Sequence, residues 1–91
     1  MVKYLSEEFM LDTLKKVQPY QIDIFKSGRH CHVDGGVYVG FGSGLHVNFD
    51  VTVFEDSEIV RQFEFAANMT EKEIEAELMS LEAYVDRIKE D

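Results

Sequence analysis

Three histidines and the chain's one cysteine are the side chains with the clearest potential for chemistry: His30, Cys31, His32 and His46. In an extended segment, His30 and His32 point to the same side, because side chains alternate along a strand. If that segment neighboured a strand carrying His46, three imidazoles could converge as zinc ligands. The spacing matches no established metal motif, and a solvated polar face is the competing interpretation. We therefore expect neither a metal nor another cofactor.

Cys31 is the one cysteine of the chain, so an internal disulfide cannot form. A thiol nucleophile needs a base within hydrogen-bond reach, but His30 and His32 would lie on the opposite face of a strand. Cys31 shares its face with Val33, which predicts a buried, small hydrophobic residue. We expect a protein without enzymatic activity. A metal- or thiol-dependent site at His30, Cys31, His32 and His46 stays an alternative.

The glycine-rich segment at residues 40–44 reads Gly-Phe-Gly-Ser-Gly. A dinucleotide-binding fingerprint needs a different glycine spacing and a following helix, and a P-loop needs Gly-Lys-Ser/Thr. Neither pattern is present, and no lysine or arginine occurs between Arg29 and Arg61. We interpret these glycines as hairpin and bulge positions.

The composition predicts one domain over residues 1–91 with a strongly acidic surface. Hydrophobic residues make up 45% of the chain, and 18 acidic against 9 basic residues give a net charge of −9. This charge repels phosphate backbones and anionic lipid, so we expect no direct nucleic-acid or membrane binding and favour a basic partner. No secretory signal or membrane span is recognisable, which predicts a cytoplasmic protein.

The elements that position these residues follow from changes in hydrophobic period. Ser6 is a good N-cap for a first helix, which we expect to end before Pro19. A period of two then predicts a strand over residues 20–24. Further strands are expected at residues 30–33, 37–41, 45–54 and 59–67, with a turn at Asp34-Gly35-Gly36. The face of the clearest strand that we expect to be buried holds Leu45, Val47, Phe49, Val51 and Val53.

The last helix has the strongest signals. Thr70 and Glu73 form a capping box, and an apolar seam follows at Ile74, Leu78, Leu81, Val85 and Ile88. The predicted fold is α+β, with an N-terminal helix, an antiparallel sheet of four to five strands and a C-terminal helix. Both helices should cover one face of the sheet.

Acidic side chains supply the strongest candidate for a binding surface. In the last helix they recur on one side, although like charges four residues apart weaken an isolated helix. Residues four apart lie about 6 Å apart along the axis, on the scale of neighbouring phosphates, so the row can imitate a nucleic-acid strand. A solvated helix face is the alternative. The predicted partner-binding residues are Glu71, Glu75, Glu82 and Asp86, with Glu55, Asp56 and Glu58 of an acidic loop.

With these acids and the helix–strands–helix order, the chain resembles, in kind, the small acidic inhibitors that bacteriophages use against host defence, such as anti-CRISPR and anti-restriction proteins. These inhibitors share no family motif, so no residue role transfers. Several occupy the nucleic-acid channel of a nuclease, and the resemblance implies the same here. The order also matches the double-stranded-RNA-binding fold. That fold needs a lysine cluster at the start of its last helix, where this chain has Thr70-Glu71-Lys72-Glu73. We therefore do not expect RNA binding.

The leading hypothesis is a non-enzymatic module that presents a negative surface to a basic, nucleic-acid-handling protein such as a nuclease. The alternative is a component of a larger assembly, or a homodimer, that uses exposed sheet edges. Ionic strength separates the two hypotheses, because salt weakens an electrostatic contact far more than an apolar one.

Overall fold

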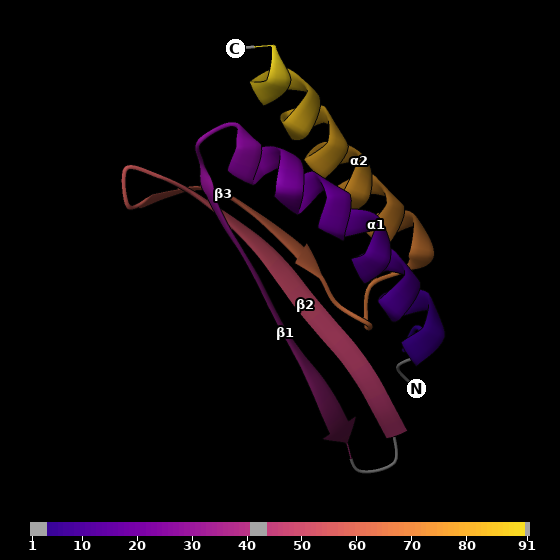
Figure 1. The fold of residues 1–91 in the computed structure, drawn as a ribbon. Coiled ribbons are helices and arrows are strands. Elements are labelled where there is room, and N and C mark those ends of the chain that lie inside the picture. Colours follow the sequence, from indigo (N-terminus) through magenta and orange to yellow (C-terminus); the bar gives the residue numbers. More distant parts are fainter. Residues whose placement is uncertain (1–3, 41–43, 91) are drawn as a thin grey trace.

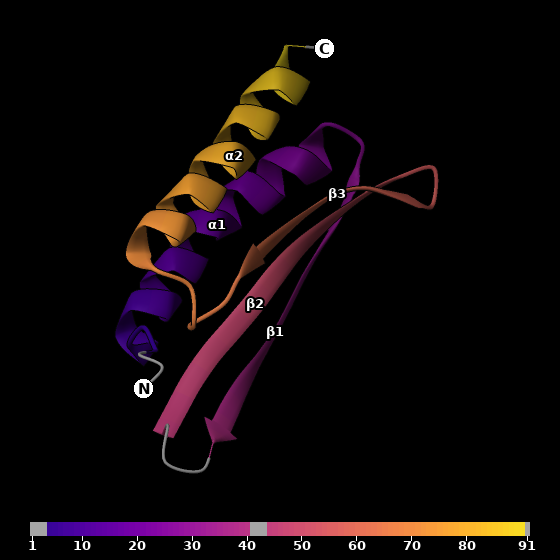
Figure 2. The ribbon, with the colours of Figure 1, turned by 180° about the vertical axis from the view of Figure 1, so that it is seen from behind.

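The computed structural model describes residues 4–40 and 44–90. These residues form α1 (Glu7–Lys26), β1 (His30–Gly40), β2 (Gly44–Glu55), β3 (Glu58–Phe65) and α2 (Glu71–Lys89). The strands pair antiparallel in the order β1-β2-β3, and both helices lie on the same face of the sheet (Figures 1 and 2). The α+β class is confirmed. The expected four to five strands are not confirmed, since the described residues form three.

The main correction concerns α1, which continues through Pro19 to Lys26. Its N-cap is confirmed, because Ser6 Oγ accepts a hydrogen bond from the Phe9 amide at 3.1 Å. The strand predicted over residues 20–24 is instead the end of this helix. A proline inside a helix costs about 3 kcal/mol. Burial along one continuous seam offsets that cost. The buried residues of α1 are Met10, Thr13, Val17 and Ile24.

The second correction is that Asp34-Gly35-Gly36 is not a turn. These residues lie inside β1, where Gly35 is paired with Phe49 of β2. A Cβ atom on Gly35 would lie 3.1 Å from the Phe49 Cβ and 3.3 Å from the Asn48 carbonyl oxygen. The glycine therefore serves close packing between two strands.

The predictions for β2 and β3 hold. Val47, Phe49, Val51 and Val53 are buried on the helix-covered face, as the alternation predicted. The turn between β2 and β3 has positive φ at Asp56 (51°) and Ser57 (69°), the geometry of a two-residue type I′ hairpin. The side chains at Val37, Val39, Phe41 and Leu45 lie outside the described part of the molecule.

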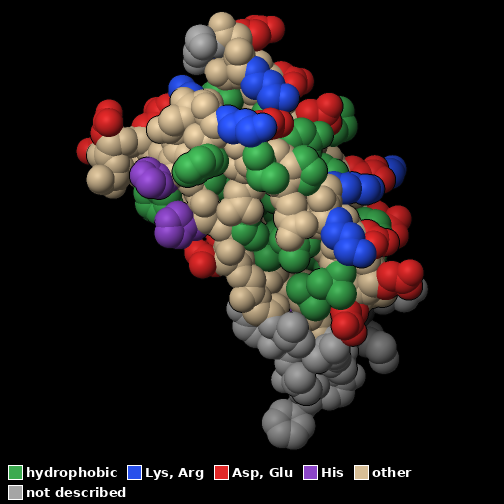
Figure 3. Space-filling model, in the orientation of Figure 1, with side chains coloured by type: hydrophobic (Ala, Val, Ile, Leu, Met, Phe, Trp, Pro, Cys, Tyr) green, Lys and Arg blue, Asp and Glu red, His purple; other side chains and the backbone are tan. Residues whose placement is uncertain are grey.

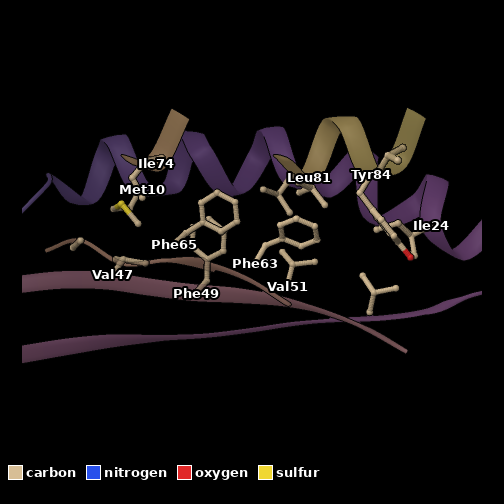
Figure 4. Packing of buried hydrophobic residues seen from close by; sticks show 14 of the residues in the cluster. Met10, Ile24, Val47, Phe49, Val51, Phe63, Phe65, Ile74, Leu81 and Tyr84 are labelled. Carbon is tan, nitrogen blue, oxygen red and sulfur yellow. The ribbon is translucent and has the colours of Figure 1, made fainter. Parts of the chain in front are cut away.

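The helix α2 matches its prediction in detail. The Thr70 amide donates to Glu73 Oε1 at 3.0 Å, and the Glu73 amide donates to Thr70 Oγ1 at 3.1 Å. Figure 4 shows Leu81 above Phe63, and Phe65 beside Phe49, whose ring centroids are 4.9 Å apart. The predicted seam is buried except for Leu78, which packs partly buried against the core, and Tyr84 joins it.

Candidate protein-binding surfaces

The strand register separates the histidines that could have formed a metal site. His32 is opposite Thr52 on β2, whereas His46 is opposite Tyr38. Six residues of β2 separate these positions, which is about 20 Å at the usual rise of a strand. His46 stacks on Tyr4, with ring centroids 4.3 Å apart. No group of three His, Cys, Asp or Glu side chains that could hold a metal occurs in the part of the chain that the structure describes.

Cys31 behaves as the sequence predicted for a small hydrophobic residue, although it is only half-buried. Its side chain packs against the core together with Val33. Burial raises the pKa of the Cys31 thiol. A raised pKa lowers the thiolate fraction at neutral pH, which is the opposite of what a nucleophilic cysteine needs.

Four predicted binding residues, Glu71, Glu75, Glu82 and Asp86, form what we call the acidic row, and all four are exposed. The buried seam of α2 fixes the rotation of the helix, so the row runs along the side of α2 that faces α1. Tyr20 of α1 marks this side, because it lies close enough to Glu82 for a hydrogen bond. Burial raises the pKa of the Tyr20 hydroxyl, and the charge and hydrogen bond of Glu82 raise it further.

Helix geometry gives the acidic row a defined length. Glu71 and Asp86 are fifteen residues apart, or about 22 Å at 1.5 Å per residue. Near the C-terminal end of the row, Lys89 Nζ lies 3.0 Å from Asp23 Oδ2 of α1. This ion pair ties the two helices together, and it pairs the charge of Lys89 with Asp23 rather than with an acid of the row.

The three acids of the loop lie elsewhere. Asp56 and Ser57 form the tip of the β2–β3 turn, which projects away from α2 in Figures 1 and 2. Asp56 and Glu58 are exposed, whereas Glu55 forms an ion pair with Arg29. The seven predicted residues therefore occupy two separate regions, and Glu55 is paired with Arg29.

A hollow near the C-terminal ends of the helices has a volume of about 550 Å³. The charged groups that line it include both members of the Asp23–Lys89 pair, together with Arg29, which is paired with Glu55. Among the described residues of its lining, no nucleophile is paired with a base. We assign it no chemistry.

The sequence interpretation missed an exposed apolar stripe on α1. Leu11, Ile22 and Phe25, which we call the α1 stripe, are 40%, 56% and 70% exposed. Figure 3 shows hydrophobic side chains beside basic ones on this side of the molecule. Spacings of eleven and three residues place all three on one side of a helix. This spacing can be read from the sequence, but the strand predicted over residues 20–24 placed Ile22 outside the helix.

The sequence interpretation also missed a line of carboxylates across the face of the sheet that the helices do not cover. Asp34 pairs with Asp50, and Asp50 pairs with Glu64 on β3. Burial raises the pKa of Asp50, and the charges of Asp34 and Glu64 raise it further. Only the register brings these three residues together, so the sequence offered no direct signal.

Within residues 4–40 and 44–90, neither helix is long and apolar enough to cross a membrane. Comparison of the chain with protein-family models, with curated proteins and with solved structures finds no match.

Proposed function

We propose that the protein is a non-enzymatic, acidic binding module that engages a basic, nucleic-acid-handling protein through the acidic row of α2. The observation that carries this proposal is the row itself: Glu71, Glu75, Glu82 and Asp86 are exposed on one side of a helix that a buried seam holds in place. The sharpest form of the proposal is an inhibitor that occupies the nucleic-acid channel of a nuclease.

Preorganisation favours this proposal over a merely solvated surface. The capping box and the buried residues Ile74, Leu81 and Val85 hold α2 in place, so binding does not have to order the backbone that carries the charges. Like charges four residues apart cost an isolated helix about 0.2–0.5 kcal/mol per pair, and the row contains two such pairs. This local cost is understandable if the negative potential is used to attract a cationic surface.

Charge reversal within the row tests the proposal. The double variant Glu75→Lys, Glu82→Lys leaves the apolar seam untouched, so it should fold. A matched control, Asp34→Lys with Glu64→Lys, changes the net charge equally at exposed positions of the sheet, away from the row. Immobilised wild-type protein, variant and control would be exposed to purified basic nucleases and other nucleic-acid-binding proteins, with salt and competing DNA or RNA titrated in.

We expect wild type and control to bind a partner and the row variant to lose it, because wrong-sign contacts at an interface cost several kcal/mol. Added nucleic acid should displace the wild-type protein, and binding should weaken as salt rises. Equal binding by the row variant would contradict the proposal. So would a ternary complex in which the partner holds nucleic acid and this protein together.

A further inference from the structure

We propose that a second copy of this chain covers the α1 flank, forming a two-fold symmetric dimer. In this dimer β1 pairs with β1 of the partner copy, and the two α1 helices pack antiparallel along the α1 stripe. The sheet then becomes a continuous sheet of six strands with both α1 helices on one face. This inference is independent of the acidic row and of the proposed function.

The α1 stripe points away from α2 and toward the open side of the sheet. Tyr20 faces α2, and at 100° per residue Leu11 and Ile22 lie about 180–200° around the helix from it. Gln21, between these directions, donates a hydrogen bond to the Cys31 carbonyl at 3.5 Å, which places that side of α1 over β1. The stripe and the free edge of β1 therefore belong to one surface.

The edge of β1 has few of the features that prevent strand pairing. Residues 30–40 contain no lysine, arginine or proline and one acid, Asp34, and the strand is 11 residues long. A long edge without such residues can pair with another strand. On the opposite edge of the sheet, the Glu64 amide of β3 donates a hydrogen bond to Glu77 Oε2 at 3.2 Å. Each of these strands has one described backbone contact with a helix side chain, at Cys31 on β1 and at Glu64 on β3. The β1 edge is the better one for association because β1 has 11 residues against 8 in β3, and because the α1 stripe lies on its side of the molecule.

The charges of α1 are complementary to themselves under a two-fold axis at the middle of the helix. An axis level with Lys16 and Val17 sets Leu11 against Ile22 of the partner copy. The same axis sets Glu7 and Glu8 near the level of Lys26 at both ends of the contact. Two copies of net charge −9 repel each other, and Lys15 and Lys26, which accompany the apolar side chains on this flank, reduce that repulsion locally.

The same axis fits the strands. The middle of α1 lies about 14 Å before Lys26 at 1.5 Å per residue. A run of about 14 Å along β1 from His30 ends between Asp34 and Gly35, near the middle of that strand. The helix α1 packs over both β1 and β2, so its axis lies about half a strand spacing inward from β1. With strands about 4.8 Å apart, the two α1 axes on either side of the β1–β1 pair would be about 10 Å apart. Packed helices are usually 8–10 Å apart.

Sedimentation or light scattering over a wide range of concentration tests the dimer. We expect wild type to be dimeric, and Ile22→Asp or Phe25→Asp to be monomeric with an unchanged fold by circular dichroism. The matched control is Met79→Asp on α2, where the side chain is 69% exposed, and this variant should stay dimeric. A monomeric wild type would overturn the proposal, as would a dimer that survives both α1 variants.

A charge swap then tests the register. Glu8→Lys and Lys26→Glu should each weaken the dimer by about tenfold, equivalent to about 1.4 kcal/mol. The double variant restores both opposite-charge contacts and should recover wild-type dimerisation. In a Cys31→Ser background, Leu11→Cys with Ile22→Cys should form a disulfide between copies. A double variant weaker than either single one, or failure of the cysteines to cross-link, would refute this antiparallel packing.

Discussion

The two flanks of the molecule expose opposite kinds of surface. On α2, the acidic row is exposed along the side that faces α1, and on the opposite side of the helix Glu77 accepts a hydrogen bond from the amide of Glu64 on the edge strand β3. On the α1 flank, exposed leucine, isoleucine and phenylalanine lie beside β1, and Gln21 reaches the Cys31 carbonyl near the start of that strand. Charge keeps a surface in water, whereas exposed apolar side chains beside a long edge strand favour contact.

This contrast has a simple physical basis in the two helices. Both bury one seam against the same sheet, and the residues on either side of that seam are free to differ. Helix α2 has acids on the side facing α1, while α1 has its apolar stripe on the side facing away from α2. One small domain can therefore offer an electrostatic surface and an apolar surface at the same time.

The largest expected effect compares two leucines, one from each helix. Leu81 of α2 is 0% exposed, and Leu11 of α1 is 40% exposed. Leu81→Ala should lower the free energy of unfolding by about 2–5 kcal/mol, because it removes buried surface and leaves a cavity. Leu11→Ala should cost less than about 1 kcal/mol. Urea denaturation of dilute, monomeric protein measures both values, and equal losses would show that the α1 stripe belongs to the core.

The fold could be predicted best where local signals and tertiary packing agree. The capping box at Thr70 and the strict alternation from Val47 to Val53 each identify an element correctly. The predicted end of α1 before Pro19 was wrong because the local preference of proline is to end a helix, whereas the buried seam continues from Val17 to Ile24. Asp34-Gly35-Gly36 misled because a glycine needed for close packing against Phe49 looks like a turn.

The candidate surfaces followed the same pattern. The acidic row depends on spacing within one helix, so the sequence sufficed to find it. The α1 stripe required the correct length of α1, and Ile22 had been assigned to a strand. The line formed by Asp34, Asp50 and Glu64 depends on the register of three strands, which no local pattern specifies.

The next effect concerns the length of α1. Pro19 is exposed inside this helix and cannot donate a hydrogen bond to the carbonyl of Lys15. Pro19→Ala restores that donor and should raise the free energy of unfolding by about 1–3 kcal/mol. Thermal and urea unfolding measure the gain. A loss of stability would mean that the helix requires the rigidity that proline provides.

A smaller effect compares the N-caps of the two helices. Thr70 exchanges two hydrogen bonds with Glu73, whereas Ser6 accepts one from Phe9. Thr70→Ala should cost about 0.5–2 kcal/mol, and Ser6→Ala should fall at the lower end of that range. Urea denaturation of the two variants under identical conditions gives the order. The reverse order would show that the N-terminus of α1 matters more to stability than that of α2.

The smallest effect concerns Asp50, which lies between the two flanks, with Asp34 of β1 on one side and Glu64 of β3 on the other. The folded state raises the pKa of Asp50 above 3.8, mainly through burial and then through these two carboxylates. The folded protein therefore holds this proton more tightly than the unfolded chain. Its contribution to stability rises as pH falls through the raised pKa and is constant below both pKa values.

Asp50→Asn keeps the size of the side chain and removes its charge. At pH 7 it should raise the free energy of unfolding by about 0.2–1 kcal/mol, because like charges directly opposite each other in a sheet repel. The advantage over wild type should shrink as the pH approaches the ordinary range of aspartate, where wild-type Asp50 is itself protonated. Paired urea titrations at several pH values measure this difference, and Asn48→Asp, which adds a charge one position along the same face, should act in the opposite direction. An advantage independent of pH would assign the effect to hydrogen bonding by the amide rather than to relief of charge repulsion.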